Sequence, residues 1–468
     1  MTVSGGTFET TAANILGDSA SVNISSGTYS LGGNDTVGSL TISGGSLSGS
    51  STLTAATYAL QGGTVSANLG AGAATASAGT TALNGNLSGS LEATGGTVNA
   101  AGTIGGNVTV SGGTVNLSAA DRIANGAAVS VSSGTLGMGA NNDTVGSFSI
   151  SGGTLGGTGK LTAATYGLSG GTVNANLGAG TVNANSGTTS LNGTVDATTV
   201  NVGGGTLNLG SAARLAAGTT ANVSSGTLST GGNETITRLN ATGGTVNLTD
   251  DTLTVTGTGA NKSSIGSSVT ATGGTISVQG ALDYQATSGT TALSVASGGT
   301  LSGSGTTSST LSVSGKLAPG NSTGIMNVGS TTFLGGGSYA WEIDNFTGTV
   351  GTSWDFLNIT GNLTISANSG SQFIIDVISL IPSNDTAGLA SNFNDATNYS
   401  FAIATASGTI SGYASNAFSI NTSGFQNSFT GTWGTSLSNG GKSLNITYSA
   451  ATAIPEPSSA ALTLIGLG

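Results

Sequence analysis

A Gly-Thr or Gly-Ser dipeptide closes short alternating runs of aliphatic and small polar residues throughout the first half of the chain. Examples are VTVSGGTVNL and VSVSSGTLGM, and the glycine next to the Thr or Ser recurs every 16 to 21 residues. These glycines are Gly6, Gly27, Gly45, Gly63, Gly79, Gly96, Gly113, Gly134, Gly153, Gly171, Gly187, Gly205, Gly226 and Gly244. A unit of this length is typical of one coil of a β-solenoid, in which short strands stack on their copies in the next coil.

Each unit carries its own corner. In NVTVSGGTVNL, Val108 and Val110 lie two residues apart, and Val115 and Leu117 resume the alternation out of phase after two glycines. Alternation with period two predicts strands with one buried face. Glycines at the break can take positive φ, so the chain turns while both strands still face inward.

A longer repeat overlies the short one. LTAATYALQGGTVSANLGAG at Leu53 returns as LTAATYGLSGGTVNANLGAG at Leu161, and the second long copy lacks one whole short unit. A stack in which each coil contacts only its neighbours tolerates such a loss. This favours an all-β, right-handed parallel β-helix (β-solenoid). The alternative is an antiparallel meander of hairpins with glycine-containing turns.

The amino-acid composition excludes several kinds of catalytic and binding site. The chain has no Cys and no His, which removes thiolate nucleophiles, imidazole bases and the usual zinc ligands. Its net charge of −11, with seven Lys and Arg residues, argues against nucleic acid as a partner. We therefore predict a protein that is not an enzyme, with no cofactor and no catalytic or metal-binding residues. Apolar residues make up 36% of the chain and alternate regularly, which favours a fold over disorder.

Aromatic residues mark a boundary. Trp341, Trp354 and Trp433 lie in the last third of the chain, as do nine of the eleven Phe residues, from Phe333 onward. A thicker core with longer strands is expected there. We predict a repetitive β-solenoid at 1–316, a more aromatic, β-rich C-terminal region at 317–450 that continues or caps it, and a tail at 451–468.

Two stretches in this region and two upstream motifs carry a family resemblance. LAPGNSTGIMNVGSTTF and WDFLNITGNLTI look like the closing part of autotransporter-type passenger β-helices. SAADRIANGAAVSVSSGTL and NDTVGSFSISGGTL are similar to autotransporter-associated β-strand repeats. The resemblance implies a β-helix in an exported protein. Nothing after Tyr448 has the length of the membrane barrel that a full autotransporter carries.

The tail carries a second resemblance. Pro455, Glu456 and Pro457, followed by small residues and an apolar run, resemble the C-terminal sorting signal of PEP-CTERM proteins. This resemblance implies an exosortase-type processing enzyme as partner, transient membrane contact through the tail, and a location in the cell envelope, at the cell surface or in the extracellular matrix. The apolar run is shorter than the about 20 residues of a spanning helix, so the signal is interpreted as truncated. No signal peptide is visible at Met1.

Few side chains are candidates for chemistry. Polysaccharide lyases and hydrolases on β-helices need clustered carboxylates with a base or an arginine. Asp121 with Arg122 recurs only as Arg214 without an acid, and the Asp250-Asp251 pair stands alone. We interpret the Asp121-Arg122 pair as a solvated bend.

A further set of acids recurs once per long repeat. Asp35, Asp143 and Glu234 occupy matching bends in GGNDT, GANNDT and GGNET. Copies that far apart cannot share a calcium ion, so capping of turns is favoured over calcium binding. Threonine columns are compatible with ladders that bind glycans or ice, but Thr also suits any exposed strand.

The sequence therefore predicts a non-catalytic, exported surface or matrix protein. We expect an elongated β-solenoid that acts in adhesion or in association with extracellular polysaccharide, including biofilm, and that is sorted through its Pro-Glu-Pro signal. The alternatives are a polysaccharide-degrading β-helix enzyme, either lyase or hydrolase, and an autotransporter passenger domain.

Overall fold

A computed structural model describes residues 1–266, 269–278, 281–286, 290–320 and 322–452. The chain divides into two compact units. Unit 1 comprises Met1–Ser294 and Gly305–Ser309, and unit 2 comprises Val295–Ser304 and the chain from Thr310. In both units the described residues are almost entirely β-strands and connecting bends, and the helical elements are three single 3₁₀ turns: η1 (Gly259–Asn261), η2 (Ser415–Ala417) and η3 (Asn439–Gly441).

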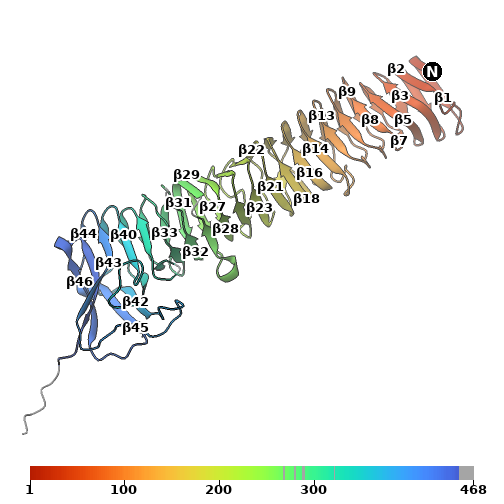
Figure 1. Cartoon of the computed structure of the whole chain (residues 1–468). Coiled ribbons are helices and arrows are strands. Elements are labelled where there is room, and N and C mark those ends of the chain that lie inside the picture. Colours follow the sequence, from red (N-terminus) through yellow and green to blue (C-terminus); the bar gives the residue numbers. More distant parts are fainter. Residues whose placement is uncertain (267–268, 279–280, 287–289, 321, 453–468) are drawn as a thin grey trace, which may run out of the picture. The chain divides into compact units, whose positions relative to one another are not determined.

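Unit 1 is a parallel β-solenoid whose coils stack one on the next (Figure 1). Its strands form three faces. Some strands bend across a corner and belong to two faces: β1 (Thr2–Thr10), β2 (Ser21–Leu31), β3 (Asp35–Ile42), β5 (Thr52–Leu60), β16 (Asp143–Ile150), β18 (Lys160–Leu168), β29 (Gly244–Val255) and β31 (Val269–Val278). The others are short.

Short strands of the first face are β8 (Ala73–Ala76), β10 (Leu91–Ala93), β12 (Val108–Val110), β14 (Ala128–Val131), β21 (Thr181–Ala184), β23 (Thr199–Val202), β25 (Thr220–Val223), β28 (Arg238–Ala241), β30 (Ser263–Ile265) and β32 (Ala281–Tyr284). Those of the second face are β4 (Ser46–Ser48), β6 (Gly63–Val65), β9 (Thr80–Leu83), β11 (Thr97–Ala100), β13 (Thr114–Leu117), β15 (Thr135–Gly137), β17 (Thr154–Gly156), β19 (Gly171–Val173), β22 (Thr188–Leu191), β24 (Thr206–Leu209) and β26 (Thr227–Ser229).

The third face is the most irregular. Its short strands are β7 (Asn68–Leu69), β20 (Asn176–Leu177) and β27 (Glu234–Ile236). Elsewhere a single bridging residue per coil replaces the strand, as in the parallel bridges from Leu87 to Ile104 and from Ile104 to Ile123. The chain division falls inside β33 (Ala292–Val295).

Register between coils follows the sequence repeat. In β11 and β13, Thr97 pairs with Thr114 and Val98 with Val115, all in parallel. The burial of both strands alternates, with the Thr outward and the Val fully buried. The predicted parallel β-solenoid is thus confirmed, and the alternative of an antiparallel meander is wrong for unit 1. Each inward Val or Leu stabilises the stack by roughly 1.5–3 kcal/mol.

The corner glycines are needed for two different reasons. Gly27 has φ of +78°, as expected for a residue that turns the chain. Gly96 has no positive φ, and the sequence interpretation missed its role. A Cβ atom at Gly96 would lie 2.5 Å from the carbonyl oxygen of Ala78 in the preceding coil. Glycine is required there because the backbones of neighbouring coils approach too closely for any side chain.

The long repeat places a buried tyrosine at equivalent positions. Tyr58 and Tyr166 are about 1% exposed or less. Each hydroxyl donates to a main-chain carbonyl, of Leu53 or Leu161 at 3.0 Å, and accepts from the amide of Ala55 or Ala163. Burial raises the pKa of both phenols. A large side chain inside the coil is therefore tolerated because its polar end is satisfied by the bend that follows the third-face strand.

Unit 2 also begins with strands that pair in parallel, but its last strands pair antiparallel. Its strands are β34 (Thr300–Gly303), β35 (Leu311–Val313), β36 (Lys316–Pro319), β37 (Ile325–Val328), β38 (Thr331–Phe333), β39 (Ser338–Ile343), β40 (Phe356–Ile359), β41 (Leu363–Ile365), β42 (Phe373–Ser379), β43 (Tyr399–Ala406), β44 (Ile410–Ser411), β45 (Phe418–Gly424), β46 (Thr432–Ser438) and β47 (Ser443–Ser449). β37, β40 and β43 pair in parallel, whereas β47 pairs antiparallel with both β43 and β46.

Aromatic side chains fill the interior of unit 2. Trp341 is fully buried and its ring lies 5.6 Å from that of Phe401, centroid to centroid. Phe425 lies 5.1 Å from Trp433, edge to face. Such pairs add to the burial of apolar area. The described part of unit 2 is β-rich with an aromatic core, as expected, but the expectation of longer strands is wrong: its longest strand, β43, has eight residues, whereas β29 of unit 1 has twelve.

The close approach at Gly96 generates a prediction. Gly96→Ala should lower the free energy of unfolding by about 1–3 kcal/mol, because the new methyl group meets the backbone of the preceding coil. The matched control is Gly126→Ala, where a Cβ atom has no atom within 4 Å. The control should change stability by less than about 0.5 kcal/mol. Urea unfolding followed by far-UV circular dichroism measures both variants, and equal midpoints would contradict the close approach.

Candidate functional site

The recurring acids Asp35, Asp143 and Glu234 are buried, and each links its own coil to the preceding coil by hydrogen bonds. We call this arrangement a staple. Asp143 lies at the start of β16, points inward and is 1% exposed. Its Oδ2 atom accepts hydrogen bonds from the main-chain amides of Arg122 at 2.8 Å and Ile123 at 3.1 Å, in the preceding coil. The carboxylate thus occupies a core position and satisfies two amides of the coil before it.

The same staple occurs at the two other copies. Asp35 accepts from the amides of Ile15 at 3.2 Å and Leu16 at 3.0 Å. Glu234 accepts from the amides of Arg214 at 2.7 Å and Leu215 at 3.0 Å. In each case the carboxylate reaches back to the preceding coil rather than only capping its own bend. The sequence predicted that these acids cap their own turns; the structure shows that they cap the bend of the preceding coil.

A strained residue precedes each pair of amides. Asn14, Asp121 and Ala213 have φ of 55°, 53° and 53°, in the left-handed region that non-glycine residues rarely adopt. Successive amides after such a residue can converge on one oxygen, as in anion-binding nests. The signal for this feature is weak in sequence, because three different residue types occupy the position.

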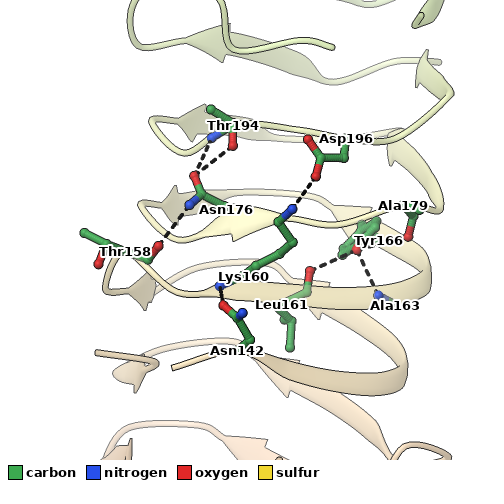
Figure 2. Close-up of polar contacts among 10 residues, drawn as sticks. All are labelled: Asn142, Thr158, Lys160, Leu161, Ala163, Tyr166, Asn176, Ala179, Thr194 and Asp196. Atoms are coloured by element: carbon green, nitrogen blue, oxygen red, sulfur yellow. Dashed lines mark hydrogen bonds and ion pairs between the residues drawn. The ribbon is translucent and has the colours of Figure 1, made fainter. Parts of the chain in front are cut away.

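The asparagine before each acid extends the staple to a third coil. Asn142 accepts from the amide of Asp121 through its main-chain oxygen, and its side-chain oxygen accepts from the amide of Lys160 at 2.8 Å. Figure 2 shows this second bond. Asn34 and Asn233 make the same two contacts in their copies. The Asn-acid pair therefore links the coil that carries it to both neighbours.

Burial changes the pKa of two of these acids, Asp143 and Glu234. Desolvation raises the pKa of Asp143 and Glu234 above the ordinary carboxyl values, and the amide hydrogen bonds oppose this without cancelling it. A carboxyl whose pKa is raised by folding favours the folded state most at low pH. Its contribution declines as the pH rises through the raised pKa.

The Asp121-Arg122 bend has a structural role. Arg122 donates from Nη1 to the carbonyl of Ala101 at 2.6 Å, and Arg214 donates likewise to Asn192 at 2.5 Å. Both guanidinium groups therefore bind the coil before their own. Asp121 makes no ion pair with Arg122 among the described residues, whose two ion pairs are Lys160–Asp196 and Lys262–Asp283.

Figure 2 shows the polar contacts near one of these ion pairs. Lys160 Nζ lies 2.5 Å from the carboxylate of Asp196, and both side chains are more than 40% exposed. An exposed pair of this kind contributes at most about 1 kcal/mol. Nearby, Asn176 donates to the carbonyl of Thr158 and accepts from the amide and hydroxyl of Thr194. These contacts tie successive bends together.

An asparagine ladder lies on the outer side of the first face. It runs through β21, β23, β25 and β28, which stack in parallel register. Asn201 donates to Asn183 at 2.8 Å, Asn222 to Asn201 at 2.9 Å, and Asn240 to Asn222 at 3.2 Å, in each case from Nδ2 to Oδ1. Ser264 donates to Asn240 at the end of the ladder. All four asparagines are half-buried.

A threonine column runs beside this ladder. Thr165, Thr181, Thr199 and Thr220 pair in register along the same face, and Arg238 follows. Threonine columns were expected from the sequence, whereas the asparagine ladder was not. Its signal is the repeated Thr-x-Asn pattern at Thr181, Thr199 and Thr220, in which the Asn always lies two residues after the Thr and so on the same side of the strand.

Unit 2 encloses an acid that does not face solvent. Asp355 is fully buried and accepts from the amides of Gly324 at 2.9 Å and Glu342 at 3.0 Å. Burial, followed by the charge of Glu342, raises the pKa of Asp355 far above the ordinary carboxyl range. Asp355 thus cross-links the backbone, as the unit 1 staples do, and a substrate cannot contact it.

The remaining predicted features are placed as follows. Asp251 accepts a hydrogen bond from the hydroxyl of Thr230 at 2.9 Å. The sorting motif at Pro455, Glu456 and Pro457 lies outside the described residues. Within the part of the chain that is described, no group of three or more Asp and Glu residues lies close enough to hold a metal ion. No helix there is long and apolar enough to cross a bilayer.

Comparison with known proteins yields no relative: no family model matches this chain, and no curated protein matches it. The resemblance to PEP-CTERM and autotransporter-type proteins therefore rests on the sequence motifs alone.

The staple generates a prediction at Asp143. Asp143→Ala should lower the free energy of unfolding at neutral pH by about 1–3 kcal/mol, because it leaves buried amides unpaired. Asp143→Asn keeps one acceptor oxygen without a buried charge, so it should be at least as stable as the wild type. The control is Asp121→Ala, since Ala213 already occupies the equivalent left-handed position.

The same variants test the pH dependence. Wild-type stability should decline relative to Asp143→Asn as the pH rises through the raised pKa of Asp143. Urea unfolding from pH 3 upward measures this difference. A wild type that gains stability over Asp143→Asn with rising pH would contradict the direction of the shift.

Proposed function

We propose that this chain is a non-catalytic, exported protein of the cell surface or extracellular matrix that lies along extracellular polysaccharide. The observation that carries the proposal is the ladder of Asn183, Asn201, Asn222 and Asn240 on the first face of unit 1. The solenoid supplies a repeating polar surface on an inert core.

The ladder has the chemistry to bind a polymer of hydroxyl groups. Each Asn amide bonds to its neighbour, which fixes its orientation, and it retains a second N–H and acceptor capacity for an outside partner. Rungs recur at the strand spacing of about 4.8 Å. The neighbouring threonine column adds hydroxyl groups with the same spacing. A regular, uncharged array of donors and acceptors matches a regular, uncharged glycan chain better than a charged ligand.

The structural use of the acids supports a binding role over a catalytic one. Asp35, Asp143 and Glu234 are at most 2% exposed and bind backbone amides. The fully buried Asp355 does the same in unit 2. General acid-base cleavage of a glycan requires carboxyl groups that reach the glycosidic bond.

Export and sorting complete the proposal. The Pro455-Glu456-Pro457 motif would be recognised by an exosortase-type enzyme, with the tail contacting the membrane only during processing. The envelope, the cell surface or the matrix is then the site of action.

Binding to a neutral polysaccharide tests the proposal. The chain should be retarded in native gels that contain hydroxyethylcellulose or another soluble neutral glucan. The double variant Asn201→Ser and Asn222→Ser should bind about tenfold more weakly, because it removes the bonds that orient the ladder. Serine already occupies this column at Ser130 and Ser149, so the fold should persist.

The matched control is Asn208→Ser, which removes an outward asparagine from β24 on the second face. It should bind as the wild type does. Equal retardation of wild type and double variant, or no retardation on any neutral or acidic glycan, would contradict the proposal. Release of new reducing ends during incubation would instead favour the enzymatic alternative.

A further inference from the structure

Arg238 follows the threonines in the threonine column of the first face. β28 pairs with β25 in parallel, and Arg238 lies opposite Thr220, the last of those threonines. Arg238 is half-buried, and Asn240, the last asparagine of the ladder, lies two residues further along the same strand. Side chains two residues apart on a strand point to the same side of the sheet. The side chain of Arg238 therefore lies beside the end of the ladder.

The hydrogen-bond donors of Arg238 are unused. Arg122 donates from Nε to the carbonyl of Ala120 at 2.9 Å and from Nη1 to the preceding coil, and Arg214 makes the same two kinds of bond. Arg238 makes no hydrogen bond and no ion pair with any described residue, and its Nε atom is buried. A charged group that has lost contact with water and gained no acceptor is costly. An acceptor from outside the chain would offset that cost.

A second cation lies next to Arg238. β30 pairs with β28 so that Ser264 lies opposite Asn240, and Lys262 is the residue immediately before β30. The same register places Lys262 opposite Arg238. The Nζ atom of Lys262 lies 3.8 Å from the carboxylate of Asp283, and the lysine side chain is 44% exposed. These three side chains together carry one net positive charge, although the whole chain carries −11.

We propose, on the basis of the function proposed above, that Arg238 and Lys262 bind an acidic group of the glycan that lies along the ladder. The ligand is then a mainly neutral polysaccharide with singly charged substituents, either carboxylates or sulfate esters. The planar guanidinium group can donate two parallel N–H bonds to such an oxyanion. One net positive charge on the protein matches one negative charge on the substituent.

An acidic subsite gives the ladder something that its amides cannot provide. The rungs from Asn183 to Asn222 are chemically alike, so a neutral chain can shift along them by one rung without losing contacts. Arg238 lies at one end of this array and differs from every rung. An acidic group bound there fixes the position of the glycan along the first face, while neutral sugars occupy the rungs.

Three cellulose derivatives test the proposal: hydroxyethylcellulose, carboxymethylcellulose of low substitution and lightly sulfated cellulose, each immobilised for surface plasmon resonance with the 468-residue chain in solution. The chain should bind at least one acidic polymer about tenfold more tightly than hydroxyethylcellulose, because hydrogen bonds to charged groups are stronger than neutral ones. The acidic polymer that binds more tightly identifies the acidic group.

The outcomes separate the two proposals. Binding to hydroxyethylcellulose that equals or exceeds binding to both acidic polymers would overturn the acidic subsite and leave the proposed function standing. No binding to any of the three polymers would overturn the proposed function itself.

Two variants locate the subsite. Arg238→Thr restores the residue type that the column has at Thr199 and Thr220, so the fold should persist. The ratio of affinity for the preferred acidic polymer to that for hydroxyethylcellulose should fall about tenfold. Lys160→Gln is the matched control, since it also removes one positive charge, from an exposed position on the third face. The control should keep the wild-type ratio. An unchanged ratio in Arg238→Thr, or an equal fall in the control, overturns the proposal.

Stability without glycan gives a second readout. Arg238→Thr should be at least as stable as the wild type in urea unfolding, because it removes an unpaired and half-buried cation. Addition of the preferred acidic polymer should raise the unfolding midpoint of the wild type more than that of the variant. A variant that is less stable than the wild type in the absence of glycan would assign Arg238 to the fold and overturn the proposal.

Discussion

Parallel backbone hydrogen bonding between successive coils is the constraint on which unit 1 depends. It brings neighbouring backbones so close that the corner residue must be glycine, as at Gly96, whatever its own φ. It also stacks equivalent residues in register, so inward positions become aliphatic columns and outward positions become polar ladders. One interaction thus fixes the core, the corners and the surface together.

Buried acids are unusual in such a core, and the backbone explains them. Where a bend leaves two amides without a strand partner, a carboxylate from the next coil supplies the acceptor, as Asp143 does for Arg122 and Ile123. Burial raises the pKa of that carboxyl, which is a cost that the amide bonds offset only in part. The same solution recurs in unit 2 at Asp355, although its surroundings are aromatic rather than aliphatic.

Much of the fold could be predicted because the same short sequence pattern recurs along the chain, once for each coil. The glycine spacing and the out-of-phase alternation around Val110 and Val115 give the coil and its inward faces, and the missing unit favours stacking. Partners across coils could not be predicted, because a single sequence does not show which bend lies beside Asp143. The ladder through Asn201 was missed since asparagine was treated as part of the polar background. The antiparallel end of unit 2 has no repeat to reveal it.

Separation of the two sides of each strand has an evolutionary consequence. In β23, Val200 and Val202 hold the coil in the stack from the inside, whereas Thr199 and Asn201 face outward, where Asn201 bonds to the asparagines of the neighbouring coils. Mutations at the outer positions therefore leave the buried core intact, in contrast to mutations at the inner positions. Whole coils can be gained or lost by recombination, as the long repeats illustrate, and each new arrangement offers a different surface pattern on an unchanged interior. The outer surface of the solenoid can therefore diversify while the fold of its interior stays the same.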